Sequence, residues 1–368
     1  MLMNEVEFSK KLARYLSSLP PNGKFGFYNC GSNSLIVLDV KKINKRAIGN
    51  QVYSFLLAGC DGKVEKRSAF VLKTYDRSLD PILRRYRIAE NIERCVKEFQ
   101  VLTSLKSVGF PVPNTCLCEL DVNVFSLPFI VMEREVLSNN RLNDFDEFAN
   151  TLVRLHGLDV ETLGISVLKT PENEYEFARR CLRYLKLYLN LYPSRNKELM
   201  KDFKLVISWL ENNIHMSSCP KYSLLHGDYR ANFNTVMTKS SKMVVIDWED
   251  AEIGDPAYDV AMTYTRMRAD NGEKAADHFV QKYIERFDGS LNERLLFYKM
   301  VSHLRLAISH SSVFSNPLRA YEIYGIEGFI SFPLLNMPIL SNRIGTSSDL
   351  TWIKNFQRFF KENRGFFR

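Results

Sequence analysis

Apolar residues recur with two different periods in the first third of the chain. Over residues 5–18 they fall at helical spacing, which predicts an amphipathic helix. Between residues 25 and 75 they form short runs separated by charged or glycine-bearing turns, which predicts strands in FGFYNC, SLIVLDV, QVYSFLLAG and SAFVLKTY. A long helix is expected over about residues 80–106, because Val96 and Phe99 begin an apolar stripe along one face.

The pattern changes near residue 136. Before it, two prolines end the long helix, and apolar segments predict strands at 115–120 and 129–132. The pattern therefore predicts an α+β chain with an N-terminal lobe of sheet and helix, residues 1–136, and a mostly helical C-terminal lobe, residues 137–368. Helices are expected in the second lobe over 144–157, 173–192, 197–214, 272–288, 292–313 and 351–363, with irregular structure over 314–348.

Composition narrows the class of protein. Hydrophobic residues make up 45% of the chain and charged residues 25%, as in an ordinary globular protein. No apolar run approaches the roughly 20 residues that a membrane helix needs, and the N-terminal segment lacks the apolar core of a signal peptide. The seven cysteines are scattered, which suits a reducing compartment. We therefore expect a cytoplasmic protein without a membrane partner.

The positive charge of the chain is unevenly distributed. The net charge is +8, and residues 1–136 carry 20 basic against 14 acidic residues, whereas residues 137–368 carry 30 against 28. A basic first lobe would attract the phosphates of a nucleotide. Nucleic acid is the competing partner, but the chain has no long basic run and no patch of interleaved aromatic and basic residues, so we predict no nucleic-acid binding.

The candidate chemistry lies in residues 222–260. Two short apolar runs, Ser223–Leu225 and 243–246, are predicted strands, and carboxylates follow them at Asp228 and Asp247. Two amides, Asn232 and Asn234, lie between them. We expect these side chains to converge at one edge of a sheet. Oxygen ligands of this kind suit Mg²⁺, and one carboxylate would remain to accept a proton from an attacking hydroxyl.

The same stretch resembles a known family. The tract HGD, an asparagine soon after it, and IDWEDAEIGDPAYDVA are similar to the aminoglycoside phosphotransferase/choline kinase-like family of small-molecule kinases. The tracts FVLK, VKEFQVLTSL, GFPVPNTC, PFIVMERE and LVRLHGLDVETLG agree in order and spacing, so the resemblance covers about residues 45–310. It implies a two-lobed protein-kinase-like fold with an antiparallel N-terminal sheet, and transfer of the γ-phosphoryl group of ATP, with Mg²⁺, to a hydroxyl of a small molecule.

The resemblance also implies roles for particular residues. Asp228 would orient or deprotonate the acceptor hydroxyl, and Asp247 would hold Mg²⁺ with one of the two asparagines. Lys73 would contact the nucleotide phosphates, with Glu98 as the carboxylate that positions it. The remaining expectations are a phosphate loop around Gly49, adenine recognition by the backbone of Glu133, Arg134 and Glu135, and structural support of the catalytic loop by His226, Asp255 and Asp259.

The chain departs from the family pattern at one position. The metal-binding asparagine of the family follows the catalytic aspartate by five positions, and here that position is Phe233. Asn234 is the better candidate, because residues 235–237 then continue as a strand, but Asn232 stays open. Alternation along an extended segment predicts that Phe233 points away from both asparagines, into an apolar side.

Two other functions are weighed against a small-molecule kinase. A protein kinase is disfavoured, because Asp247 is followed by Trp248-Glu249 and no activation segment follows. A nucleotide-binding regulator without turnover is supported by the shifted asparagine, although Lys73, Glu98 and both aspartates are present. The acceptor is not specified. Aminoglycosides are polycations and would favour an acidic second lobe, but this lobe is nearly neutral, so they are disfavoured as acceptors. Sugars, choline-like alcohols, homoserine-like compounds and other hydroxylated metabolites remain candidates.

Overall fold

The chain divides into two compact units in the computed structural model. Unit 1 consists of Met1–Asn139 and Met237–Glu249, and unit 2 of Asn140–Val236 and Asp250–Arg368. The sequence led us to place a single division after residue 136, so the return of residues 237–249 to unit 1 was not anticipated. The structure describes residues 5–19, 36–43, 50–59, 66–76, 84–138, 142, 144–191, 193, 197–287, 290–311, 358 and 361–362.

Some expectations fall outside the described residues. These are the strand over 25–30, the phosphate loop with Gly49, the irregular segment 314–348 and most of the helix over 351–363.

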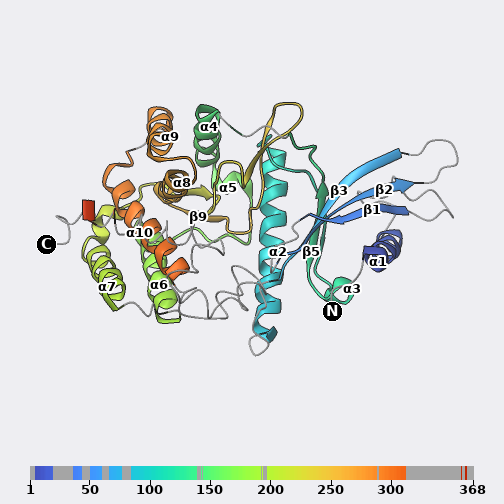
Figure 1. Cartoon of the computed structure of the whole chain (residues 1–368), viewed down its shortest axis with the longest axis horizontal. Coiled ribbons are helices and arrows are strands. Elements are labelled where there is room, and N and C mark those ends of the chain that lie inside the picture. The colour runs from blue at the N-terminus through green and yellow to red at the C-terminus, as the bar shows by residue number, and fades with distance from the viewer. Residues whose placement is uncertain are drawn as a thin grey trace, which may run out of the picture. The chain divides into compact units, whose positions relative to one another are not determined.

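Unit 1 is built on a five-stranded sheet in the order β1-β2-β3-β5-β4 (Figure 1). Every neighbouring pair is antiparallel, which confirms the predicted sheet. Alternation along β3 points Phe70 and Leu72 to one face and Lys73 to the other. The strands are β1 (Ile36–Lys42), β2 (Val52–Gly59), β3 (Lys66–Thr74), β4 (Thr115–Glu119) and β5 (Phe129–Glu133).

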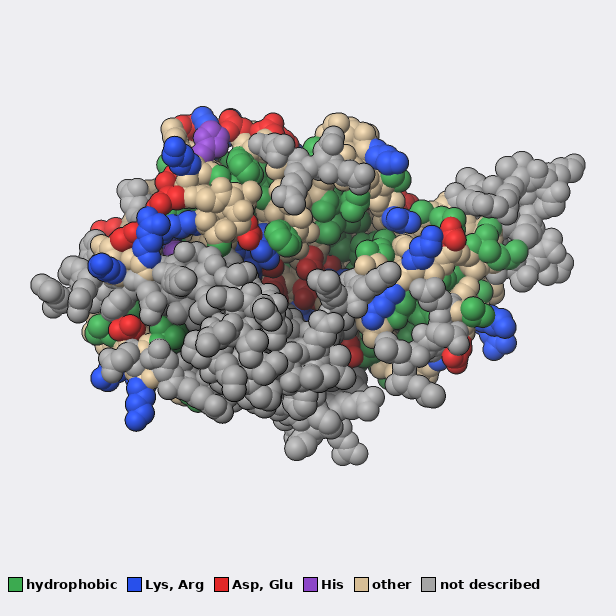
Figure 2. Space-filling view, viewed as in Figure 1, with side chains coloured by type: hydrophobic (Ala, Val, Ile, Leu, Met, Phe, Trp, Pro, Cys, Tyr) green, Lys and Arg blue, Asp and Glu red, His purple; other side chains and the backbone are tan. Residues whose placement is uncertain are grey.

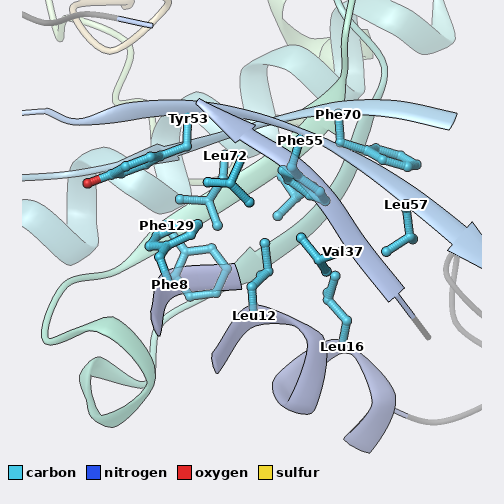
Figure 3. Close-up of a cluster of buried hydrophobic side chains, with 12 residues drawn as sticks. Phe8, Leu12, Leu16, Val37, Tyr53, Phe55, Leu57, Phe70, Leu72 and Phe129 are labelled. Atoms are coloured by element: carbon cyan, nitrogen blue, oxygen red, sulfur yellow. The ribbon is translucent and has the colours of Figure 1, made fainter. Parts of the chain in front are cut away.

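One face of the sheet is covered by α1 (Glu5–Ser18), the predicted N-terminal helix. Phe8, Leu12 and Leu16 point from this helix towards the sheet (Figure 3) and are fully or almost fully buried. Their partners in the cluster include Val37, Phe55, Leu72 and Phe129. Because three helical turns each supply one buried apolar side chain, α1 and the sheet share one hydrophobic core.

The long helix α2 (Arg84–Ser107) lies against β4 and β5 (Figure 1). Its buried apolar residues include Val101, Leu102 and Leu105, whereas Val96 and Phe99, with which the expected stripe begins, are only half-buried. The short helix α3 (Val122–Phe125) was not predicted; Asp121 caps it by accepting a hydrogen bond from the Asn123 N–H, 2.8 Å away. The important consequence for the site is that α2 faces the side of the sheet to which Lys73 points.

Unit 2 is mostly helical, as predicted, and α8 (Pro256–Asp270) lies at its centre. Helices α9 and α10 and strand β6 pack against α8, and 12 of its 15 residues are buried. The other elements are α4 (Phe145–His156), α5 (Val160–Leu163), α6 (Glu176–Leu191), α7 (Lys197–Asn212), the 3₁₀ turn Ile214–Ser217, α9 (Glu273–Arg286) and α10 (Asn292–Ser311).

Two short sheets hold the central motif. β6 (Ser223–Leu225) pairs with β9 (Glu252–Gly254), and β7 (Thr235–Met237) pairs with β8 (Met243–Val245). We expected Asp228 and Asp247 to follow strands that meet at one sheet edge. That expectation is wrong, because β6 and β8 belong to different sheets.

The surface charges and the composition of the helices are relevant to two predictions, that the chain has no nucleic-acid partner and no membrane partner. On the face in Figure 2, lysines and arginines of the described residues lie scattered among acidic, polar and apolar side chains. None of the helices in the described part of the chain combines the length and apolar character needed to span a membrane.

The core beneath α1 makes a testable prediction. Leu12 is completely buried, so Leu12→Ala should lower the free energy of unfolding by about 2–4 kcal/mol, through lost burial and a residual cavity. Val6 on the same helix is 65% exposed, so Val6→Ala should change it by less than about 0.5 kcal/mol. Urea denaturation followed by circular dichroism measures both. Equal effects of the two substitutions would show that α1 does not share the core of the sheet.

Candidate active site

The ammonium group of Lys73 lies among three carboxylates of unit 1. Its Nζ is 2.6 Å from Asp247 Oδ1, 2.7 Å from Glu98 Oε2 and 3.5 Å from Glu249 Oε2. The structure therefore brings together three of the residues singled out in the sequence, Lys73, Glu98 and Asp247, and adds a fourth. The side chain of Lys73 is only 9% exposed, so these charges interact with little screening by water.

Local structure explains why Glu98 meets Lys73. Lys73 is the penultimate residue of β3 and faces α2, and Glu98 is buried on that helix. Both carboxylate oxygens of Glu98 have further donors. The Tyr75 hydroxyl donates to Oε2 over 2.6 Å, and the Trp248 N–H donates to Oε1 over 3.2 Å. Glu98 is thus fixed by the sheet and by the segment that carries Asp247.

The pKa values of Lys73 and Glu98 follow from their surroundings. Burial alone would lower the pKa of Lys73, but Asp247, Glu98 and Glu249 together raise it well above its ordinary value. Burial raises the pKa of Glu98, and Lys73 partly offsets that effect. One carboxylate oxygen each of Glu98, Asp247 and Glu249 lie within 4.8 Å of one another, an arrangement that could hold a metal ion.

Glu249 and Arg94 are site residues that the sequence analysis missed. Arg94 Nη2 lies 2.7 Å from Glu249 Oε1, and both side chains are largely buried. The Asn50 amide also donates to Glu249. A signal for this pair was present, because Arg94 precedes Glu98 by one helical turn and Glu249 follows Asp247 by two residues. The pair links α2 to the segment with Asp247.

Asp247 has an unusual backbone conformation. Its φ of 68° lies in the left-handed region, which costs a non-glycine residue about 1–3 kcal/mol. The side chain is 42% exposed, so the strain does not come from burying it. The backbone turn that causes this strain brings the neighbouring Trp248 N–H to Glu98 and the Asp247 carboxylate to Lys73.

The second set of predicted residues lies in unit 2, on a tight turn after β6. Gly227 has a φ of +82°, and a Cβ built there would lie 2.5 Å from the carbonyl oxygen of Asp250. Only glycine fits this position. His226 Nδ1 accepts a hydrogen bond from the Asp228 N–H over 3.2 Å. The ring of His226 thus contacts the backbone of the turn that carries Asp228.

One face of α8 contacts this turn residue by residue. Asp259 accepts hydrogen bonds from the N–H groups of His226 and Gly227, and the Thr263 hydroxyl donates to the Tyr229 carbonyl. The same face pairs further along with Asp228 and Arg230. The four α8 residues, which we call the α8 stripe, follow helical spacing and are Asp259, Thr263, Arg266 and Asp270.

Asp259 is the anchor of the stripe. Burial alone would raise its pKa, but the hydrogen bond and electrostatic interaction with His156, together with the N–H group of His226, bring it below the ordinary value. Asp255 has a different role from the one we expected. It caps α8 through the Ala257 N–H and pairs with Arg294 over 2.9 Å, whereas Asp259 is the residue that holds the catalytic turn.

The two candidate asparagines have different neighbours. Asn234 Nδ2 donates to the carbonyl oxygen of Asp228 over 2.8 Å and to Asp228 Oδ2 over 3.0 Å. Asn232 instead bonds both backbone polar groups of Leu142, accepting from its N–H over 2.6 Å and donating to its carbonyl over 3.3 Å. Asn234 therefore lies beside the predicted catalytic carboxylate, and Asn232 secures a loop.

The expected position of Phe233 is wrong. Residues 232–234 form a turn rather than an extended segment, with Asn232 at a φ of 62°, so strict side-chain alternation does not apply. Phe233 is 53% exposed and lies under the guanidinium of Arg230, 3.7 Å from its ring centroid. The extra loop residue is accommodated by a left-handed turn and a cation–π contact.

The predicted hinge lies at the end of β5. The N–H groups of the first two hinge residues already have hydrogen-bond acceptors, because Glu133 donates to the Asn114 carbonyl and Arg134 to the Ala69 carbonyl, each over 2.9 Å. If this segment reads an adenine edge, the N–H donor has to come from Glu135 or a later residue.

Comparisons with known proteins agree with this geometry. A family model described as "Phosphotransferase enzyme family" matches residues 61–295. Acyl-CoA dehydrogenase family member 11 of Homo sapiens is 28% identical over 178 residues, which cover 45% of this chain and 22% of that protein. The chain thus matches less than a quarter of the length of this curated relative.

Solved structures show the same fold. Macrolide 2'-phosphotransferase type I has a TM-score of 0.57 at 14% identity, covering 90% of this chain and 98% of that chain. A thermostable mutant of aminoglycoside phosphotransferase APH(4)-Ia, in a ternary complex with AMP-PNP and hygromycin B, has a TM-score of 0.54 at 14% identity, covering 90% and 95%. These similarities confirm the predicted protein-kinase-like α+β fold.

The buried Arg94–Glu249 pair predicts a coupling. Glu249→Gln leaves Arg94 without a full countercharge, so the free energy of unfolding should fall by about 3–5 kcal/mol. The double variant Arg94→Met/Glu249→Gln should lose less than the sum of the single variants. Glu93→Gln, an exposed change on the same helix, is the control. Additive effects in urea denaturation would mean that the pair does not couple α2 to the 247–249 segment.

Proposed function

The chain belongs to the phosphotransferase enzyme family, and from this premise we propose that it transfers the γ-phosphoryl group of ATP to a hydroxyl of a small molecule. The observation that carries the proposal is the buried Lys73–Glu98 pair next to Asp247. A lysine held by a helix glutamate beside a metal-binding aspartate is the arrangement that kinase-type phosphoryl transfer uses.

The nucleotide side of the reaction would use unit 1. Lys73 would exchange part of its contact with Asp247 for the phosphates of ATP, while Glu98 keeps the ammonium in place. Since Tyr75 and Trp248 donate to Glu98, the glutamate does not have to reorganise when the nucleotide binds. Positioning of this kind is the main contribution that a protein makes to phosphoryl transfer.

The residues present fit Mg²⁺. The carboxylates of Glu98, Asp247 and Glu249 lie close enough together to share an ion, and the partly exposed Asp247 supplies an oxygen ligand of the kind that Mg²⁺ prefers. We propose that Asp247 and Asn234 hold the ion, with Asn232 excluded by its bonds to Leu142. When bound, Mg²⁺ would neutralise the charge that develops on the phosphate oxygens.

Asp228 would be the base of the reaction. One of its carboxylate oxygens, Oδ2, accepts from Asn234, whereas Oδ1 has no directed hydrogen-bond donor among the described residues. Burial raises the pKa of Asp228, and Arg266 partly offsets this effect. A carboxylate with a raised pKa is a stronger proton acceptor.

Two other functions have weaker support. The regulator without turnover rested on the shifted asparagine, but Asn234 contacts Asp228 after all. The dehydrogenase name of the curated relative does not extend to this chain, because the match covers 22% of that protein and the family match is to phosphotransferases.

The proposal predicts a metal-dependent reaction. A panel of hydroxylated metabolites, screened for release of ADP from ATP with Mg²⁺, should contain an acceptor. Asp247→Asn should reduce that turnover by at least about a hundredfold, because it removes a charged oxygen ligand. Glu90→Gln, an exposed change in unit 1, should leave it unchanged. A folded Asp247→Asn protein with full turnover would refute the metal assignment.

The asparagines provide a separate prediction. Asn234→Ala should lose most activity and recover part of it at high Mg²⁺, because a weakened site is filled by mass action. Asn232→Ala should keep its Mg²⁺ dependence and show lower thermal stability, because two hydrogen bonds to Leu142 are lost. Mg²⁺ titrations of both variants decide the point, and the reverse ranking would move the ligand to Asn232.

A further inference from the structure

The contact between Arg266 and Asp228 differs from the other contacts of the α8 stripe. Arg266 Nε lies 2.7 Å from Asp228 Oδ1, yet neither atom has a directed hydrogen bond among the described residues. The contact is therefore an attraction between charges rather than an oriented bond. The planar fork of a guanidinium binds a carboxylate or phosphate best through two parallel N–H groups, and Asp228 does not use it in this way.

Arg230, which lies on the same turn, pairs with a carboxylate through directed hydrogen bonds. It binds Asp270 through two hydrogen bonds, from Nε over 2.9 Å and from Nη2 over 3.1 Å. Arg266 lies one helical turn before Asp270 on α8 and has no comparable bidentate partner among the described residues. Of the two arginines where α8 meets the turn, Arg230 on the turn thus has a complete carboxylate partner and Arg266 on α8 has an incomplete one.

The electric field at Arg266 includes further charges of unit 2. Arg230 and Arg305 act on it as like charges, and Asp228 and Asp270 as opposite charges. Asp270 is occupied by Arg230, and Arg305 interacts most strongly with the Tyr258 hydroxyl and more weakly with Asp250. Asp228 is consequently the main countercharge of Arg266, and it is also the proposed base.

That dual use has a chemical consequence. In the proposed transfer, the acceptor O–H bond breaks, its proton goes to Asp228, its oxygen forms a bond to the γ-phosphorus, and the bond from phosphorus to the ADP oxygen breaks. Protonated Asp228 is neutral, so it no longer compensates the charge of Arg266. A second anion beside Arg266 would restore the balance, whereas a cationic acceptor would add to the imbalance.

We propose that Arg266 determines acceptor specificity by binding an oxyanion group, a carboxylate or a phosphate, on the hydroxylated substrate. This inference rests on the proposed function and deepens it from any small alcohol to a hydroxylated anion. Arg266 is close enough to Asp228 that the oxyanion and the reacting hydroxyl belong to one small molecule. The oxyanion completes the guanidinium fork, while Asp228 accepts the proton of the hydroxyl.

The test compares neutral and anionic compounds of matched skeleton. Glycerol with glycerate, 1,4-butanediol with 4-hydroxybutyrate, and glycerol with glycerol 3-phosphate are titrated by calorimetry into protein saturated with AMP-PNP and Mg²⁺; choline is the cationic probe. Saturating nucleotide prevents the anions from reporting on the phosphate site. At least one anion should bind about tenfold or more tightly than its neutral counterpart, and choline should not bind more tightly than the neutral compounds.

Variants assign the preference to Arg266. Arg266→Gln should bring the anion-to-neutral ratio close to one, and Arg266→Lys should retain part of it, because the charge remains without the fork. Arg183→Gln is the control, since Arg183 is 62% exposed in the same unit and its loss removes the same charge. If Arg266→Gln is too unstable to assay, the lysine variant and the wild-type ratio still decide the proposal.

Three results would overturn the inference: no anionic preference in the wild-type protein, a preference that survives Arg266→Gln, or an equal loss of kcat for all acceptors, which would assign Arg266 to the transferring phosphoryl group. The outcome for the proposed function is separate. An anion that binds through Arg266 without ADP release would contradict the kinase and support the oxyanion site. ADP release with neutral or cationic acceptors alone would do the reverse.

Discussion

The ion cluster around Lys73 is the interaction on which the arrangement of unit 1 depends. One ammonium holds together a strand, a helix and the segment 247–249, which arrives from a distant part of the sequence. A buried charge without its partner costs several kcal/mol, so each carboxylate constrains where its own segment can lie. The return of residues 237–249 to the sheet unit and the strained backbone of Asp247 are both consequences of satisfying that charge.

Unit 2 solves a similar problem with a helix instead of a sheet. The turn at 226–230 has backbone polar groups that bond to α8: Asp259 accepts from the N–H groups of His226 and Gly227, and Thr263 donates to the Tyr229 carbonyl. The central helix of the unit is buried almost all round, so its buried polar residues need partners, and the turn supplies those of Asp259 and Thr263. Packing and catalytic geometry are therefore set by the same face of α8.

Much of this could be read from the sequence, and the failures have specific causes. Lys73, Glu98 and Asp228 could be singled out as candidates because motif and spacing are local features, and apolar periodicity located most helices. Arg94 and Glu249 were missed because their pairing requires knowing that two remote segments meet. The placement of Phe233 was wrong because we assumed an extended segment, whereas a left-handed residue at Asn232 turns the chain. The stripe on α8 was visible as a spacing, but its partners were not.

Asp228, on the turn at 226–230, and Asp259, which bonds to that turn from α8, show how the environment of a carboxylate shifts its pKa. Asp259 is completely buried but receives two backbone N–H groups and His156, and its pKa falls below the ordinary value. Asp228 receives one amide and an ionic contact without a directed hydrogen bond, and its pKa rises. Where hydrogen-bond donors outweigh the effect of burial, the pKa of a carboxylate falls and the group stays ionised. Where burial outweighs the donors, the pKa rises and the carboxylate accepts a proton more readily. The difference in donor count, more than the identity of the residue, explains why the pKa values of Asp259 and Asp228 shift in opposite directions.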